Sequence, residues 1–176
     1  HVRSRRQRQM CIRDRDISVF RIDDRLIHGQ IITAWIAYAD AKTIIVADDK
    51  AAKDEFQQSL LKMATPDSIA LKILSVDDAI AYIQSGEGSG KVLLLMRGPE
   101  QALKFIEAGI EKDQINVGNM NMKKGKTKVL GNLWVFPEDV EAIKGIYGHG
   151  VRLEVRAVPN ERSQDVMELL KKCKLA

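Results

Sequence analysis

Short apolar runs alternate with helical patterns from Ile17 onward, and this alternation limits the available folds more than any other feature of the chain. Runs typical of strands occupy residues 17–22, 42–48, 70–75, 91–97, 115–119 and 151–158. Helical patterns occupy residues 29–40, 53–64, 76–86, 99–109, 137–150 and 161–173. Strands that alternate with helices form parallel βαβ units, because a helix is the usual crossover between parallel strands. The sequence therefore predicts an α/β fold built on a doubly wound sheet.

Two further segments have distinctive local patterns. Residues 85–90, Ser-Gly-Glu-Gly-Ser-Gly, follow a predicted helix and precede a strand. That order is the reverse of the one a dinucleotide-binding loop requires, so we interpret the segment as a flexible turn. Residues 122–136 interrupt the alternation, and we predict a hairpin there that turns at Lys124-Gly125.

Charge is distributed unevenly along the 176 residues, a length typical of one domain. Residues 1–16 hold six arginines and two aspartates, whereas residues 17–176 hold 22 basic and 22 acidic side chains. We therefore predict one domain at 17–176, preceded by a basic tail that is disordered or non-native. Nucleic-acid binding is a hypothesis that rests on the tail alone, because the rest of the chain has no charge bias.

Cysteine usage and hydropathy indicate the compartment. Cys11 and Cys173 belong to no Cys-x-x-Cys pair, which argues against a zinc site or a disulfide framework and favours a reduced, cytoplasmic setting. No apolar run approaches the roughly 18 residues that a membrane-spanning helix needs. Any membrane association is therefore expected to go through a partner.

The loops after the predicted strands contain most of the candidate site residues. Ligand sites in doubly wound folds lie at the carboxyl ends of the strands. Four such loops contain polar or glycine residues: 23–29, 48–49, 97–98 and 118–119. We expect all four to share one rim of the sheet.

His28 is the residue in these loops with the widest chemical range. A neutral histidine is a competent nucleophile, and the charges of Arg21 and Arg25 disfavour a further cation beside it. Arginine also offers a planar fork that matches phosphate oxygens. Gly29 leaves room for close approach, and a helix that starts near Gln30 would direct free N–H groups at an anion.

Other roles for this loop remain open from the residues alone. A lone loop histidine is most often a surface or capping residue, and a metal site would have only aspartates nearby as further ligands. Asp23 and Asp24 suit three roles equally well: accepting a hydrogen bond from the imidazole of His28, orienting Arg25, or starting the helix.

The order of residues adds a family resemblance. Residues 21–30, Arg-Ile-Asp-Asp-Arg-Leu-Ile-His-Gly-Gln, resemble the active-site loop of the IIB components of the mannose/fructose/sorbose family of the bacterial phosphotransferase system (PTS). Residues 45–49, 94–110, 115–120 and 151–161 also resemble segments of that family. The resemblance runs from Ile17 to about residue 170, and the tail has no counterpart in it.

The resemblance implies an open, mostly parallel sheet of about seven strands with helices on both faces. It implies a sugar phosphotransferase in which His28 accepts a phosphoryl group at Nδ1 from the phosphohistidine of a IIA domain. His28 then passes the group to a sugar held by the membrane components IIC and IID. No cofactor or metal is expected. The resemblance further implies a cytoplasmic protein that reaches the inner face of the membrane through these partners, with a homodimer as one option.

Site roles follow from the same resemblance. His28, Arg25, Asp23 and Asp24 are expected in the catalytic group, with Arg25 stabilising the phosphoryl group. The residues expected to bind the phosphoryl group are Arg21, Gly29, Gln30, Arg97, Asn116 and Gly118.

A receiver-like phospho-aspartate domain is the main alternative, because it is also a small doubly wound fold with acids at strand ends. Such a domain places the phosphorylated aspartate after strand 3 and a lysine after strand 5. Here the third strand ends at Ser75 and the fifth runs into Gly118-Asn119, so the pattern does not match. Elsewhere, we interpret His149 as a turn residue and expect Trp35 and Tyr38 to pack in the core.

Overall fold

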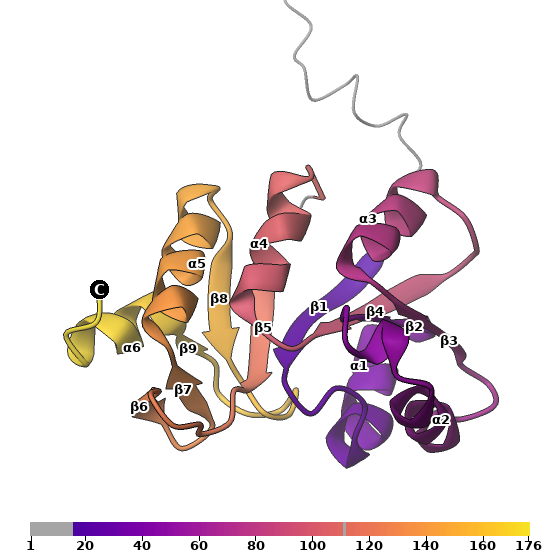
Figure 1. Ribbon diagram of the computed structural model, residues 1–176, viewed down its shortest axis with the longest axis horizontal. Coiled ribbons are helices and arrows are strands. Elements are labelled where there is room, and N and C mark those ends of the chain that lie inside the picture. Colours follow the sequence, from indigo (N-terminus) through magenta and orange to yellow (C-terminus); the bar gives the residue numbers. More distant parts are fainter. Residues whose placement is uncertain (1–15, 111) are drawn as a thin grey trace, which may run out of the picture.

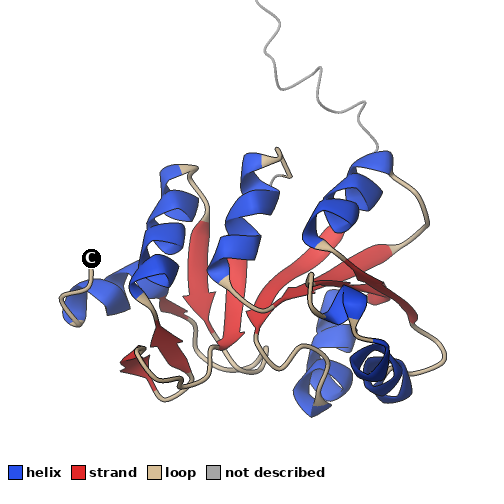
Figure 2. Ribbon diagram, in the orientation of Figure 1, coloured by secondary structure: helices blue, strands red, loops and turns tan. Residues whose placement is uncertain are grey.

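The computed structural model describes residues 16–110 and 112–176. Residues 1–15, which contain nearly all of the predicted tail and Cys11, lie outside the described residues. Seven strands form one sheet in the order β3-β2-β4-β1-β5-β8-β9, and all neighbours pair in parallel except β9, which is antiparallel to β8 (Figure 1, Figure 2). The predicted mostly parallel α/β fold is confirmed.

The sheet strands are β1 Ile17–Asp23, β2 Ala41–Ala47, β3 Ala70–Leu74, β4 Lys91–Met96, β5 Gln114–Asn119, β8 Arg152–Val155 and β9 Gln164–Asp165. The helices are the π-helical η3 Ile31–Trp35, α1 Ile36–Ala39, the 3-10 turn η4 Ala51–Lys53, α2 Glu55–Ala64, α3 Val76–Ser85, α4 Pro99–Glu107, α5 Pro137–Gly148 and α6 Val166–Lys172. A separate hairpin consists of β6 Thr127–Leu130 and β7 Leu133–Val135. No helix of the described residues is both long and apolar enough to cross a membrane.

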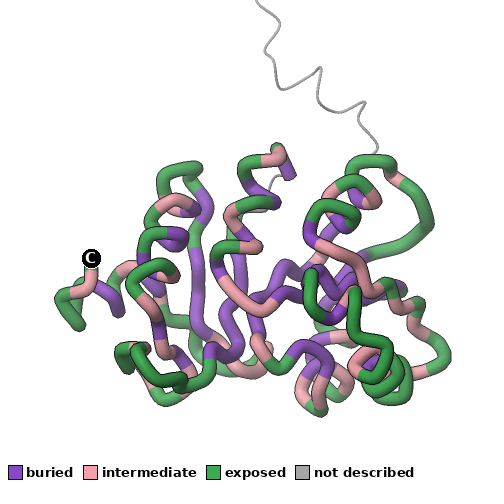
Figure 3. Tube along the Cα trace, in the orientation of Figure 1, coloured by how far each residue is buried: buried purple, intermediate pink, exposed green. Residues whose placement is uncertain are grey.

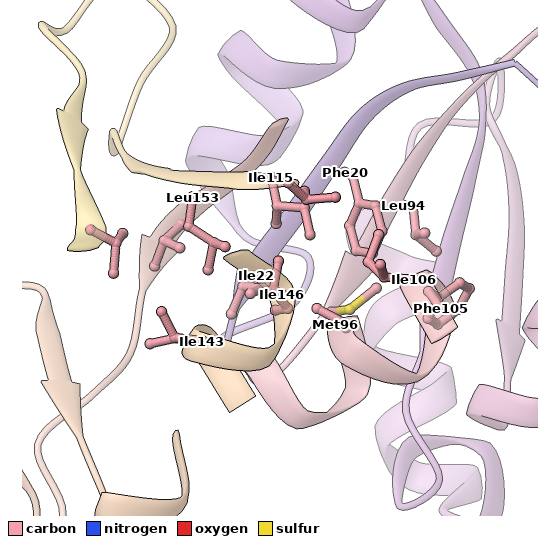
Figure 4. Close-up of a cluster of buried hydrophobic side chains, with 14 of the residues drawn as sticks. Phe20, Ile22, Leu94, Met96, Phe105, Ile106, Ile115, Ile143, Ile146 and Leu153 are labelled. Carbon is pink, nitrogen blue, oxygen red and sulfur yellow. The ribbon is translucent and has the colours of Figure 1, made fainter. Parts of the chain in front are cut away.

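Side chains alternate between two cores on the two faces of the sheet. In β4, Leu93 and Leu95 join one buried cluster, whereas Leu94 and Met96 join the other. This period of two is the pattern of a strand that is buried on both faces. The strands β1, β2, β4, β5 and β8 are accordingly buried along most of their length, whereas the edge strand β3 is not (Figure 3). The larger cluster packs the sheet against α3, α4, α5 and α6. Figure 4 shows the part in which side chains of α4 and α5, such as Phe105 and Ile146, meet those of the strands.

The opposite face is covered by η3, α1 and α2, and the buried cluster there involves β1, β2 and β4. On β5 and β8 this face is polar. Ile115 and Val117 of β5 belong to the larger cluster, so Asn116 between them points the other way, and the same alternation on β8 places Glu154 beside it. Both Asn116 and Glu154 are nevertheless buried.

The structure corrects two expectations about the second half of the chain. The hairpin turns at residues 131–132, between β6 and β7, and not at Lys124-Gly125. Gly125 has a φ of +92° and forms a tight turn that leads into β6, while pairing of Met120 with Leu133 fixes where the hairpin docks. The closing helix also begins later than predicted, at Val166, because β9 uses the residues before it to pair with β8.

Candidate functional site

The loop of residues 24–28 joins the carboxyl end of β1 to the following helix. The backbone N–H of Leu26 donates to the carbonyl of Asp23 at 3.0 Å, which closes a turn. Leu26 adopts a φ of +59° and is fully buried. A left-handed conformation costs a non-glycine residue about 1–2 kcal/mol, whereas burial of a leucine side chain contributes about 1.5–3 kcal/mol. Burial of Leu26 therefore offsets the strain and anchors the loop.

Asp23 lies at the centre of the site and is fully buried. Its carboxylate accepts hydrogen bonds from the side chains of Arg21 (2.9 Å), Arg25 (2.9 and 2.8 Å) and His28 (3.0 Å). Burial alone would raise the pKa of Asp23. The hydrogen bonds from Arg25 and His28 and the charge of Arg21 instead hold that pKa well below its ordinary value. Asp23 is therefore a fixed negative charge at physiological pH.

The contact with Asp23 determines which nitrogen of His28 is free. An ionised carboxylate can only accept, so the Nε2 atom that lies 3.0 Å from Asp23 Oδ2 carries a proton and donates it. In the neutral ring, Nδ1 then keeps its lone pair. The His28 side chain is 18% exposed, so a partner can reach it from the surface. The arrangement presents a nucleophilic Nδ1 atom.

Arg25 is fixed in position by Asp23, yet part of its guanidinium is still available to bind an anion. Its Nε and Nη2 atoms bind the two oxygens of Asp23 as a fork, and Nη2 also donates to Gln30 Oε1 at 3.2 Å. The bond to Asp23 raises the pKa of Arg25, so the guanidinium stays charged. Its Nη1 atom has no partner among the described residues, and its side chain is 36% exposed. A preorganised cation therefore lies within the same loop as His28.

Arg21, Asn116 and Gly118 are buried, and their predicted role as phosphoryl-binding residues stays a prediction. Arg21 is fully buried beneath Asp23 and binds Asn116 Oδ1 and the carbonyls of Arg156 and Ala157. A Cβ atom on Gly118 would lie 1.8 Å from Arg21 Nη2, so Gly118 makes room for the guanidinium. Arg21, Asn116 and Gly118 therefore hold Asp23 in position from the buried side of the site.

Asp24 binds residues at the end of β5, and its predicted catalytic role stays a prediction. Its carboxylate accepts from Asn119 Nδ2 at 2.8 Å, and from the backbone N–H and side-chain amide of Asn121 at 2.7 and 2.9 Å. Asp24 therefore ties the loop to the end of β5, and Asp23 alone binds His28.

Arg97 joins three of the predicted loops at one rim. Its Nε donates to Asp48 Oδ2 at 3.0 Å, and its Nη1 donates to the carbonyl of Asp24 at 2.8 Å. Together with the bond between Asp24 and Asn119, these contacts confirm that the four loops share the carboxyl edge of the sheet. Burial opposes the ionisation of Asp48, but bonds from Ala51, Gln101 and Arg97 lower its pKa.

The helix that follows His28 begins at the expected place. The carbonyl of His28 accepts the first helical hydrogen bond, from Ile32, so the first free N–H groups of the helix lie beside the imidazole. Gly29 is exposed, and a Cβ atom there would meet nothing within 4 Å. After Gln30, residues Ile31–Trp35 form the π-helical segment η3, an irregularity that recurs near functional sites.

The polar contacts among the residues around Arg21 were not predicted from the sequence. Trp35 is fully buried as predicted, and its Nε1 donates to the Ala157 carbonyl that Arg21 also uses. Tyr38, in contrast, is 56% exposed, so the predicted core position is wrong for it. Buried Glu154 and half-buried Arg156 complete the polar cluster. The alternating charges of residues 152–156 were the available signal, because one face of that strand had to be polar.

Two other candidate features lie apart from this cluster. His149 is exposed at the end of α5, consistent with its interpretation as a turn residue. Over residues 16–110 and 112–176, no group of three or more histidine, cysteine, aspartate or glutamate side chains is placed to hold a metal ion.

Known proteins match this chain over nearly its whole described length. The family model for the PTS sorbose subfamily IIB component matches residues 17–176. The sorbose-specific EIIB component of Lacticaseibacillus casei is 34% identical over 152 residues, which cover 86% of this chain and 93% of that protein. The N-acetylgalactosamine-specific IIB component 2 of Escherichia coli is 34% identical over 155 residues, which cover 88% and 99% of the two chains.

A solved structure agrees with these matches. The crystal structure of the IIB domain of the sorbose permease from Klebsiella pneumoniae superposes with a TM-score of 0.85 at 30% identity, covering 89% of this chain and 97% of that one. Sequence, fold and the polar loop after β1 thus agree. The chain belongs to the sorbose-subfamily IIB components of the phosphotransferase system, and it is a phosphoryl carrier of sugar transport.

Proposed function

We propose that His28 carries the phosphoryl group and that its Nδ1 atom forms the bond to phosphorus. The observation that supports this most strongly is the 3.0 Å contact between His28 Nε2 and Asp23 Oδ2. The contact places the proton on Nε2 and leaves the Nδ1 lone pair free to attack. Among the described histidines, the other, His149, is an exposed helix-end residue.

The two transfers balance without a further reactant. In the first, Nδ1 attacks phosphorus as the P–N bond to the histidine of a phosphorylated IIA domain breaks. In the second, a sugar hydroxyl attacks, the P–Nδ1 bond breaks, and the hydroxyl proton passes to solvent. Because Asp23 keeps the proton on Nε2, the phosphorylated ring of His28 is cationic, which makes it a good leaving group for the second transfer.

Arg25 is proposed to stabilise the phosphoryl group during both steps. Its fork is already fixed on Asp23, and the exposed Nη1 atom offers a charge-assisted hydrogen bond to an equatorial oxygen. The first N–H groups of the helix, at Gly29 and Gln30, add donors beside His28. Arg97 is proposed to contribute positive charge at the rim of the same loops.

The partners follow from the family. A IIA domain supplies the phosphoryl group, and membrane components IIC and IID hold the sugar that receives it. Relatives named for sorbose and for N-acetylgalactosamine are each 34% identical to this chain. We therefore propose sorbose, N-acetylgalactosamine or a sugar related to them as the acceptor. We place the protein in the cytoplasm, at the inner face of the membrane through these partners. A homodimer stays a prediction, which sedimentation over a range of concentrations would measure.

Labelling tests the assignment of His28. The full chain would be incubated with radiolabelled phosphoenolpyruvate, the general PTS proteins and a IIA domain. We expect label on wild type and on the control His149→Ala, and no label on His28→Ala. The label should be lost in acid and stable in alkali, whereas an acyl phosphate on aspartate would be lost in base. Label that persists on a folded His28→Ala variant would overturn the assignment.

A further inference from the structure

A continuous chain of buried hydrogen bonds connects Glu154, on β8, to the imidazole of His28. Glu154 Oε1 accepts from Asn116 Nδ2 at 3.3 Å, and Asn116 Oδ1 accepts from Arg21 Nη1. Arg21 Nη2 donates to Asp23 Oδ2 at 2.9 Å, and the same oxygen accepts from His28 Nε2 at 3.0 Å. We refer to these five residues as the Glu154–His28 chain. All of its members except His28 are buried.

The two neighbours of Asn116 in this chain, Glu154 and Arg21, fix the orientation of its amide. A carboxylate only accepts and a guanidinium only donates, so Glu154 attracts the NH₂ group of Asn116 and Arg21 attracts its oxygen. The carbonyl of Arg156 accepts from the same NH₂ group at 3.2 Å. An amide that turned over would point NH₂ at the Arg21 guanidinium, a contact between two donors. Glu154 and the Arg156 carbonyl therefore both favour the orientation in which Arg21 receives an acceptor.

Charge within the buried cluster is balanced only when Glu154 is ionised. Arg21 and Arg156 supply two positive charges, and Asp23 and Glu154 supply two negative charges. Arg156 binds Glu154 Oε1 at 2.8 and 3.2 Å, and the guanidinium carbons of both arginines lie over the Trp35 ring, at 4.5 and 5.5 Å from its centroid. With these four charges cancelled, the charge of Arg25 is left for the phosphoryl group.

Burial of Glu154 also costs free energy. Its Oε2 atom is buried and has no hydrogen-bond partner among the described residues. A buried carboxylate with an unused oxygen loses hydration without full compensation. An apolar side chain of similar size would avoid this cost, which suggests that the carboxylate is needed by the rest of the cluster.

We infer that Glu154 is a positioning residue for phosphoryl transfer, acting through Asn116, Arg21 and Asp23 to hold His28 with its proton on Nε2. The inference rests on the proposed role of His28 as the phosphoryl carrier. Among the described contacts Glu154 has none with His28 itself, and its effect is on the orientation of Asp23. Loss of its charge should allow Asn116 to turn over, displace Arg21 and weaken the preference of His28 for the Nε2–H tautomer.

The test uses the full chain with Glu154→Gln, which keeps the size and removes the charge. The matched control is Glu141→Gln, the same substitution on α5 at a side chain that is 74% exposed. Nitrogen NMR of His28 reports the tautomer directly and needs no phosphoryl donor. We expect a strong preference for Nε2–H in wild type and control, and a substantial Nδ1–H population in Glu154→Gln.

The kinetic readout is the rate of phosphoryl transfer from a phosphorylated IIA domain. We expect kcat to fall roughly 10-fold in Glu154→Gln, by analogy with the loss when a residue that orients a metal-binding histidine is replaced, with KM unchanged within about twofold. A lowered kcat with an altered tautomer, in a protein that melts cooperatively, supports the inference. If Glu154→Gln does not fold, Glu154→Asp replaces it, because the shorter side chain keeps the charge but does not reach Asn116.

Two results would overturn the inference. One is an unchanged tautomer and an unchanged kcat in folded Glu154→Gln, and the other is an equal fall in the Glu141→Gln control. Failure of the proposed function would look different: wild type itself would carry no label on His28, while the NMR comparison would still report whether Glu154 sets the state of that ring.

Discussion

Replacing Asp23 by asparagine removes the one carboxylate that Arg21, Arg25 and His28 share. Arg21 is fully buried, and breaking a buried ion pair by removing one partner costs about 3–5 kcal/mol. Asn116 and two carbonyls still bind Arg21, which favours the lower end of that range. The pair with Arg25 is partly exposed and adds at most about 1 kcal/mol. We therefore expect Asp23→Asn to lower the free energy of unfolding by about 3 kcal/mol.

The effect on phosphoryl transfer should be larger than the effect on stability. The amide of asparagine offers either an oxygen or an NH₂ group to His28, so the proton is no longer held on Nε2. In serine proteases, the analogous exchange of an aspartate that orients a histidine lowers the rate by about 10⁴-fold. We expect transfer to Asp23→Asn to be slower by about 100-fold or more.

Urea unfolding and single-turnover transfer from a phosphorylated IIA domain measure the two effects. Asp67→Asn, at an exposed aspartate outside the site, is the control and should change neither quantity. An Asp23→Asn variant that is within 1 kcal/mol of wild type and transfers at the wild-type rate would refute the reasoning.

The pH dependence of the free energy of unfolding tests the same role of Asp23. Because the folded state lowers the pKa of Asp23 below its ordinary value of 3.8, the unfolded state binds the proton first as pH falls. The stability that Asp23 contributes is complete above that value and is lost as pH falls through its folded pKa. The difference in free energy of unfolding between wild type and Asp23→Asn should therefore narrow below about pH 4. A difference that stays constant from pH 7 to pH 2 would contradict this.

Three further substitutions test separate parts of the site. Arg25→Lys should leave the fold intact but slow phosphoryl transfer about 10-fold, because a point charge replaces the fork on Asp23. Single-turnover experiments measure the transfer rate, and an unchanged rate would contradict this prediction. Gly118→Ala should destabilise the protein by about 3 kcal/mol, because its Cβ would lie 1.8 Å from Arg21 Nη2 and break a buried ion pair; Gly131→Ala, with nothing within 4 Å, is the control in urea unfolding. Leu26→Ala should lower the free energy of unfolding by about 2–5 kcal/mol, measured in urea. Leu26→Gly should lower it by no more than Leu26→Ala does, because glycine relieves the left-handed strain. A glycine variant clearly less stable than the alanine variant would show that this strain is absent.

The sheet and its rim were predictable because they follow from local patterns. A strand buried on both faces reads as a continuous apolar run, as residues 91–97 do, and parallel strands place their carboxyl ends at one edge. Asp48, Arg97 and Asn119 could thus be assigned to one rim before any contact was known. The position of His28 at a helix start followed from the same alternation.

The layer beneath the site could not be predicted, because it depends on residues far apart in the sequence. Arginine is normally exposed, so the sequence predicts that Arg21 faces an incoming phosphoryl group, although it lies between the apolar Phe20 and Ile22 on a buried strand. Its partners Asn116 and Glu154 come from strands that only the folded sheet brings together. The hairpin turn was also misplaced, because Lys124-Gly125 and Gly131-Asn132 both have turn-forming residues and only tertiary pairing selects between them.

The central claim is that His28 carries the phosphoryl group on Nδ1 because Asp23 holds the proton on Nε2. Phosphorus and nitrogen NMR of the fully phosphorylated chain, with nitrogen-labelled histidine, tests it most directly. We predict a single phosphohistidine signal, with phosphorus coupled to Nδ1 of His28 and a proton retained on Nε2. Phosphorus bonded to Nε2 of His28, or to any other residue, would contradict the account.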